Sequence, residues 1–172
     1  METWNAIVSR RNVREFADRP IGDEDLDRIL EAGRRAPSSR NWQPWEFIVV
    51  TDRAQLGELS QVWRGGAHIA HSAATVVIVL PRFEDDAARL ERAAFDAGQA
   101  SLQMMVAAAD LGIGSGHSAV GDQDRARELL GFPEDRVAYI MIDFGYPSGR
   151  PLQPIRRPDR RPFEEVVHRG RW

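Results

Sequence analysis

The strongest constraint on the fold is the run 75–80, in which all six residues are apolar or β-branched, closed by Pro81. A strand that is apolar on both faces has to be covered on both faces, so we expect this run at the centre of a sheet. The shorter run 47–50 predicts another buried strand, and 137–142 predicts a strand that ends before Gly145-Tyr146-Pro147. Other parts of the chain must therefore cover both sides of the sheet.

Helical patterns lie between these runs. Segment 23–35 has apolar residues at helical spacing, acidic residues in its first turn and arginines in its last, and Pro37 ends it. Segment 85–111 has small or flexible side chains on much of its circumference, which predicts a long buried helix that packs closely against another element. A short helix is expected at 124–130, and Thr51-Asp52 can cap another.

Composition narrows the chemistry. With 172 residues, 42% of them hydrophobic, the chain can bury one core, and we expect a single domain over residues 1–172. The absence of cysteine excludes thiolate nucleophiles, iron–sulfur clusters and cysteine zinc sites. All 23 basic residues are arginine, which excludes a Schiff-base lysine and a Walker-type phosphate loop. Redox chemistry would therefore need a bound cofactor.

The charge balance argues against nucleic acid as a partner. The net charge is −3 and the pI is near 5.8, whereas nucleic-acid binding depends on neutralising many phosphates. No apolar stretch approaches membrane-spanning length, and the first residues do not resemble a secretory signal. We therefore expect a cytoplasmic protein without a membrane partner.

Two polar clusters near the amino end carry the functional signal. The first, 10–14, combines three arginines with Asn12, and the second, 37–45, places four hydrogen-bonding side chains between two prolines and ends at Trp45. A solvated basic face and an ordinary loop are the simpler interpretations. We favour ligand binding, because arginine recognises phosphate in a bidentate manner and loops of this composition often hold ligands.

The glycine run 112–116 resembles a dinucleotide fingerprint, but it follows a helix instead of a strand, so we reject that assignment. Gly112 is expected to cap the preceding helix, and the other glycines could let the backbone pass close to a flat ring. His68 and His71 have the spacing of a metal pair but lack an acidic ligand nearby, so we expect them to be structural or exposed and predict no metal site. His117, directly after the glycine run, is a weak candidate.

The composition changes after Pro147. Segment 149–162 is rich in proline and arginine, and such a segment cannot form its own core. We expect it to run extended over a surface.

With these motifs the chain resembles the FMN-dependent nitroreductase family. The matching pieces are 10–16, 36–47, 111–115 and 145–147 with the arginine-proline tail, in family order over nearly the whole chain. The resemblance implies an α+β fold, with a mixed β-sheet flanked by helices in three α/β/α layers. It also implies an intertwined homodimer with an extended C-terminal tail and two FMN molecules at the interface.

The resemblance further implies which residues bind FMN. Arg10 and Arg14 would contact the phosphate, ribityl and pyrimidine groups, with Asn12 beside them. Ser38, Ser39 and Asn41 would come from the partner chain, and Arg11 and Gln43 are further expected FMN ligands. The backbone around His117, Ser118, Ala119 and Val120 would face flavin N5. Arg160 or Arg161 would be the second arginine that binds the phosphate.

The implied activity is that of an oxidoreductase that accepts hydride from NADH or NADPH on FMN and passes it to a nitroaromatic, a quinone or a related small acceptor. Such an enzyme would show ping-pong kinetics without an essential protein acid or base. Two alternatives stay open: an FMN-binding storage protein with little turnover, and a flavin-fragmenting or deazaflavin-linked relative.

Overall fold

The computed structural model describes residues 2–172. Its helices and strands, in chain order, are α1 (Thr3–Ser9), α2 (Asp23–Arg34), β1 (Glu46–Val50), α3 (Arg53–Leu59), β2 (Ala74–Pro81), α4 (Ala87–Asp110), β3 (Gly114–Ala119), α5 (Gln123–Leu130) and β4 (Arg136–Gly145). Short 3-10 turns are η1 (Ser39–Asn41), η2 (Ala67–His71) and η3 (Phe163–Glu165). The elements predicted from sequence are present with shifts of up to three residues at their ends, the largest at the end of β4. The sequence analysis missed α1 and β3.

The four strands form one sheet in the order β1-β2-β4-β3. Every strand pair is antiparallel, so the expected mixed sheet is wrong for the described residues; their one parallel pairing is the isolated bridge between Asn12 and Ser115. The physical reason is the position of β4. The chain leaves β2, crosses through α4 and returns as β3 in the same direction, but β4 inserts between these two strands and is antiparallel to both.

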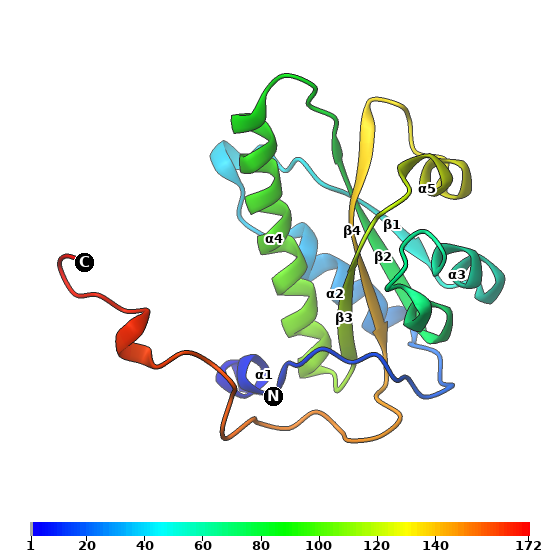
Figure 1. The fold of residues 1–172 in the computed structure, drawn as a ribbon. Coiled ribbons are helices and arrows are strands. Elements are labelled where there is room, and N and C mark those ends of the chain that lie inside the picture. Colours follow the sequence, from blue (N-terminus) through cyan, green and yellow to red (C-terminus); the bar gives the residue numbers. More distant parts are fainter. Residues whose placement is uncertain (1) are drawn as a thin grey trace.

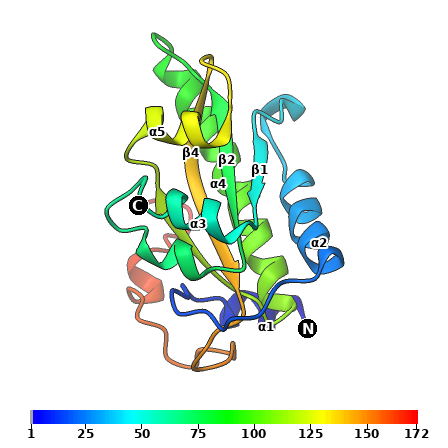
Figure 2. The same ribbon diagram turned by 90° about the vertical axis from the view of Figure 1, so that its right-hand side faces the viewer.

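Helices cover both faces of the sheet, which confirms the three-layer expectation. Figure 2 shows α3 and α5 in front of the strands and α4 behind them, with α2 beside α4. One buried cluster joins α2 and α4 to one face, and a second cluster joins α3 and α5 to the other. Strand β2 contributes Val76 and Ile78 to the first and Val77 and Val79 to the second, so its predicted central position is confirmed.

Two burial predictions need correction. Strand β1 was expected to be buried, but it is an edge strand in which Val50 is buried and Val49 is exposed, because no strand pairs with its outer edge among the described residues. Helix α4 was expected to be buried on much of its circumference. It buries small residues such as Ala97 and Ala100 against the sheet, but Phe95 and Leu102 on its other side are 69% and 54% exposed.

Gly112 caps α4 as predicted. It has a φ of 75°, and its N–H donates to the Ala109 carbonyl while the N–H of Ile113 donates to the Ala108 carbonyl. This pair of bonds is a Schellman motif, and buried Ile113 supplies its usual apolar contact. The turn sets the direction in which the chain enters β3.

The chain after β4 leaves the sheet. Figure 1 shows the tail passing α1 and ending away from the body of the domain. The N–H of Ile155 donates to the Val8 carbonyl, and the apolar side chains of Phe163, Val166 and Trp172 are exposed. Among residues 2–172, no helix combines the length and the apolarity that crossing a membrane requires.

We expect Gly112→Ala to lower the free energy of unfolding by about 1–2 kcal/mol, because a residue with a Cβ is strained in the left-handed region. No atom lies within 4 Å of the added methyl, so the loss isolates backbone strain from packing. Urea unfolding monitored by circular dichroism measures it. Gly57→Ala, within α3 and equally unobstructed, should instead gain about 0.5–1 kcal/mol. Equal changes in the two variants would contradict the capping role.

Candidate functional site

The first polar cluster lies alongside the start of β3. The N–H of Val13 donates to the Ser115 carbonyl, which holds the 10–14 segment against the outer edge of the strand. A Cβ on Gly114 would lie 2.6 Å from Val13 Cγ2, and one on Gly116 would lie 2.9 Å from the Val13 carbonyl oxygen. The glycines therefore admit this chain's own backbone and side chains. This corrects the idea that they leave space for a flat ring.

Positive side chains line a groove beside this contact. The groove has a volume of about 460 Å³, and its lining residues are Arg11, Asn12, Val13, Arg14, Glu15, Pro147, Gly149 and Arg150. The Arg11 guanidinium donates to the Arg150 carbonyl, and the Nε of Arg11 is buried without a hydrogen-bond partner. Three guanidinium groups with unused donors against one carboxylate suit an anionic ligand such as a phosphate.

Arg10 is not part of this groove. It lines another groove of about 610 Å³, between α1 and the carboxyl half of α4, together with Ile7, Leu102 and Val106. The structure therefore divides the predicted arginine trio between two neighbouring surfaces.

The second polar cluster is a loop held under backbone strain. Arg40, Asn41 and Gln43 all have φ between 51° and 57°, a region that costs a residue with a Cβ of order 1 kcal/mol. Buried Asp96 of α4 stabilises the loop by accepting hydrogen bonds from the N–H of Ser39 at 3.1 and 3.3 Å. Strain of this kind is often found at ligand clamps.

The polar side chains of the loop bond mainly to one another. The N–H of Gln43 donates to Ser38 Oγ at 2.9 Å, and the Gln43 side-chain amide donates to Asn41 Oδ1 at 3.1 Å. Asn41 and Gln43 are exposed, whereas Ser38 and Ser39 are half-buried. The predicted anchor, Trp45, is buried and stacks on Phe47.

Within one chain the two clusters lie at opposite ends of α4. The loop contacts Asp96, whereas the 10–14 segment lies at β3, which starts just after α4 ends at Asp110. Fourteen helical residues span roughly 20 Å. Figure 1 shows the loop beside the upper part of α4 and the 10–14 segment below its lower end. The described chain alone therefore does not bring Ser38, Ser39, Asn41 or Gln43 to the groove.

The open edge of β3 supplies backbone donors. Strand β3 is the last strand of the sheet, and the Ser115 carbonyl points outward to Val13. Because backbone groups alternate in direction along a strand, the N–H groups of His117 and Ala119 point outward too. Both residues are exposed, and no hydrogen-bond partner for these N–H groups is present in residues 2–172. This is the strand that the resemblance places against flavin N5.

Ser118 points the other way, into a buried polar cluster that sequence analysis missed. Its Oγ lies 3.2 Å from His68 Nε2, and the same nitrogen lies 3.3 Å from Asp143 Oδ2. Asp143 has no exposed surface, and its neighbour across the sheet on β2 is Thr75. His71, at the exposed end of η2, takes no part, so the two histidines are structural and exposed respectively. Residues 2–172 contain no group of His, Asp and Glu side chains that could hold a metal ion.

Burial controls the protonation of this cluster. It raises the pKa of the Asp143 carboxyl to about 7, although the residue's own backbone N–H and the Arg14 guanidinium act in the opposite direction. Burial lowers the pKa of His68, the positive charge of Arg14 lowers it further, and a hydrogen bond with the Gly65 backbone opposes both effects. Near pH 7 the imidazole is therefore neutral and the carboxyl is partly protonated.

These three residues do not form a hydrolytic triad. In a triad the serine and the carboxylate bond to opposite nitrogens of the imidazole. Here Ser118 and Asp143 approach the same nitrogen, and the Ser118 hydroxyl is buried, so no substrate can reach it.

The tail arginines lie outside the groove. Arg160 donates to the Asp159 carbonyl, and Arg161 contacts Glu165 Oε2 at 3.4 Å. Both are exposed, and neither lines any pocket with the 10–14 segment. Their predicted role at a phosphate depends on a second chain.

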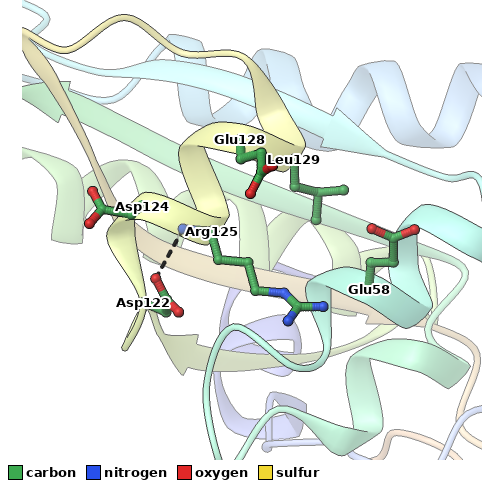
Figure 3. Close-up of a pocket in the computed structure, with 6 residues that line it drawn as sticks. All are labelled: Glu58, Asp122, Asp124, Arg125, Glu128 and Leu129. Atoms are coloured by element: carbon green, nitrogen blue, oxygen red, sulfur yellow. Dashed lines mark hydrogen bonds between the residues drawn. The ribbon is translucent and has the colours of Figure 1, made fainter.

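A larger groove between α3 and α5 is unsuitable for a phosphate. Figure 3 shows its lining residues, which are Glu58, Asp122, Asp124, Arg125, Glu128 and Leu129. Four carboxylates against one guanidinium repel anions. Asp122 also has a structural role, because its carboxylate accepts from the Arg125 N–H and caps α5.

Of the site residues that sequence analysis missed, one has a recognisable signal in the sequence. Asp143 is a charged residue inside an otherwise apolar strand, which is a signal for a buried, perturbed carboxyl. His68 and Arg150 had no such signal, because only the tertiary fold places η2 and the start of the tail beside β3 and the 10–14 segment.

Comparison with known proteins adds independent findings. The chain matches the model of the Nitroreductase family over residues 7–75 and 54–146. It is 34% identical to an Archaeoglobus fulgidus protein provisionally named NADH dehydrogenase/NAD(P)H nitroreductase, with 99% of each chain aligned.

Solved structures with the same fold include two named flavoenzymes. An FMN-dependent nitroreductase from Clostridium difficile superposes with a TM-score of 0.82 at 28% identity, covering 97% of this chain and 99% of that one. The NADPH:FMN oxidoreductase from Vibrio harveyi, complexed with NAD+, superposes with a TM-score of 0.81 at 26% identity, covering 97% of this chain and 76% of that one.

Asp143→Asn should change how stability depends on pH. The folded pKa of Asp143 is about 7 and that of an unfolded aspartate is about 3.9, so the folded state holds the extra proton between these values. Wild-type stability should therefore fall as pH rises from about 4 to about 7, by up to about 4 kcal/mol, and the variant should lack this loss.

Urea titrations across this pH range measure the difference between the two proteins, in which the opposite contribution of His68 largely cancels. Asp124→Asn, which removes an exposed carboxylate from α5, should keep the wild-type slope. Parallel curves for wild type and Asp143→Asn would contradict a raised pKa at this position.

Proposed function

The chain belongs to the nitroreductase family, and on that basis we propose that it is an FMN-dependent oxidoreductase that takes hydride from NADH or NADPH and reduces small acceptors such as nitroaromatics or quinones. The observation that carries the proposal is the arginine-lined groove next to the open edge of β3. The curated and solved relatives named above as flavin or nitro reductases support it. We also propose that the protein acts in the cytoplasm, where NADH and NADPH are available.

The donor set fits FMN. Arg11 and Arg14 supply guanidinium groups for the phosphate, and the Nε of Arg11 is a buried donor that lacks a partner. The outward N–H groups of His117 and Ala119 provide hydrogen bonds for the ring. When bound, FMN supplies the redox chemistry by accepting a hydride from a nicotinamide and passing it to an acceptor.

The protein's contribution is orientation and electrostatics. Arginines near the ring stabilise the negative charge that reduction adds, because their positive charges are in place before the reaction. His117 is the one exposed titratable residue on β3, and hydride transfer to and from the flavin does not itself require a protein acid or base. Donor and acceptor would use the same open side in turn, which predicts ping-pong kinetics.

We further propose that the active form is a homodimer. The exposed side of α4 carries Phe95 and Leu102, and Trp4 and Ile7 on neighbouring α1 are also exposed. Apolar side chains clustered on two packed helices favour association. A second chain would cover them, and it would also supply the 38–43 loop that one chain cannot bring to its own groove.

The direct test is the absorption spectrum of the purified protein together with its mass in solution. We expect a yellow dimer that contains about two FMN per dimer and is bleached by NADH or NADPH. Bound flavin that neither nicotinamide bleaches would favour storage. A colourless monomer that takes up no added FMN would contradict the proposal.

Arg14→Ala and Arg11→Ala should each weaken FMN binding about 10- to 100-fold, because each removes a charge-assisted hydrogen bond worth about 1.5–3 kcal/mol. Flavin fluorescence quenching measures the dissociation constant. Arg34→Ala is the matched control, since Arg34 is an exposed residue of α2 paired with Glu31. If both site variants bind FMN as wild type does, the phosphate assignment is wrong.

Leu102→Arg should give a monomer that also loses FMN, because it puts a charge in the proposed interface and separates the two halves of the site. Light scattering after size-exclusion chromatography gives the mass, and the spectrum gives the flavin content. Val49→Arg changes an exposed apolar residue on β1, at the far edge of the sheet, and should leave both unchanged. If the variant stays dimeric but loses flavin, the proposed interface at Leu102 is wrong. If it becomes a monomer that keeps FMN, the proposal that two chains share the site is wrong.

A further inference from the structure

Asp143 is a buried carboxyl without an adequate partner. It has no exposed surface, and neither carboxyl oxygen forms a hydrogen bond with another residue. An ionised carboxylate in such a position would cost several kcal/mol, so the folded protein should keep the site only with a proton or a nearby positive charge. The residue lies on β4 opposite Gly116 of β3, where a Cβ on Gly116 would meet Asp143 Oδ2 at 2.7 Å.

Among the described residues, the strands, turn and helix near Asp143 supply no free positive charge to it. Strand β2 places Thr75 opposite it, but the Thr75 hydroxyl bonds to Ser72. Turn η2 supplies neutral His68, and β3 supplies Gly116 and Ser118. The nearest arginine of α3, Arg53, donates to the carbonyls of Ala70 and Ser72.

The remaining element is the 10–14 segment with its continuation to Glu15. The segment approaches Asp143 at Gly116, where an added Cβ would meet both Asp143 Oδ2 at 2.7 Å and the Val13 carbonyl oxygen at 2.9 Å. Arg14, the residue after Val13, lines the groove together with Arg11 and Glu15, and its positive charge favours the ionised form of Asp143 and the neutral form of His68. Arg14 is therefore the positive charge that the buried carboxyl and a ligand in the groove share.

We propose that Asp143 is a positioning residue for the phosphate of the ligand: its ionised form attracts Arg14 when the groove is empty, and it takes up a proton when a phosphate binds to Arg14. This inference rests on the proposed function, in which that phosphate belongs to FMN. Binding of the phosphate neutralises Arg14 and adds negative charge near Asp143, so the ionised form loses its one favourable neighbour. The proton that Asp143 takes up keeps the buried cluster neutral.

The sign of the effect follows from linkage. A ligand that raises the proton affinity of a group binds more tightly when that group is protonated. FMN affinity should therefore fall as pH rises through the range in which Asp143 ionises. A shift of about one pKa unit on binding makes the loss about tenfold and the proton uptake about half a proton at about pH 7.5.

A purely structural role makes a different prediction. If Asp143 only supported the packing of β3, its replacement by the isosteric amide would change FMN affinity by the same factor at every pH. The slope of FMN affinity against pH therefore distinguishes a proton-linked role of Asp143 from a packing role.

The experiment measures the FMN dissociation constant from about pH 6 to about pH 8.5 by fluorescence quenching, with riboflavin as a ligand that lacks the phosphate. Wild type should bind FMN about tenfold more weakly at the upper end than at the lower end, after correction for phosphate ionisation. Asp143→Asn should have a flat profile. Asp18→Asn, which removes a fully exposed carboxylate four residues after Arg14, should follow wild type. Riboflavin should show no slope with any of the three proteins.

Equal slopes for wild type and Asp143→Asn would overturn the coupling while leaving FMN binding intact. A protein that binds no FMN at any pH would overturn the proposed function and this inference with it. A second readout needs only wild type: a carboxyl 13C resonance should titrate near pH 7 in the FMN-free protein and at a higher pH with FMN bound. A resonance that does not move on binding counts against the inference even if Asp143→Asn fails to fold.

Discussion

The burial of β2 on both faces determines the arrangement of everything around it. A strand with no polar face requires helices on each side, and the chain supplies α2 with α4 on one side and α3 with α5 on the other. Because β4 pairs with β2, β3 is left as the outer strand with an open edge. The edge at which we place FMN is thus a consequence of where the apolar core had to lie.

The proposed site combines exposed and buried electrostatics. Arg11 and Arg14 face a groove at the surface, where each charge alone is weakened by solvent. Asp143 and His68 are buried next to this groove, where charges interact more strongly and nearby charges shift the pKa values of both residues. Arg14 links the exposed groups to the buried ones. The site is therefore better described as one coupled set of charges than as a surface patch above an inert core.

Sequence reasoning succeeded where local patterns decide the outcome. The double-sided burial of β2, the cap at Gly112 and the helix at 23–34 follow from residue types and their spacing. It failed where distant segments meet. The groups that approach His68, the groove that excludes Arg10 and the glycines that admit Val13 depend on tertiary contacts that no local pattern encodes. The contacts attributed to a partner chain, for Ser38 to Gln43 and for the tail arginines, need a second copy of the chain.

The strand order has a consequence for biosynthesis. Strand β3 pairs with β4 alone among the strands, and β4 is the last strand in the chain. During translation β3 emerges before β4, so the peptide groups of β3 that face β4 stay unpaired until residue 145 has left the ribosome. The sheet is completed from the inside by its final segment. A nascent chain truncated before that point could not assemble the edge at which we place FMN.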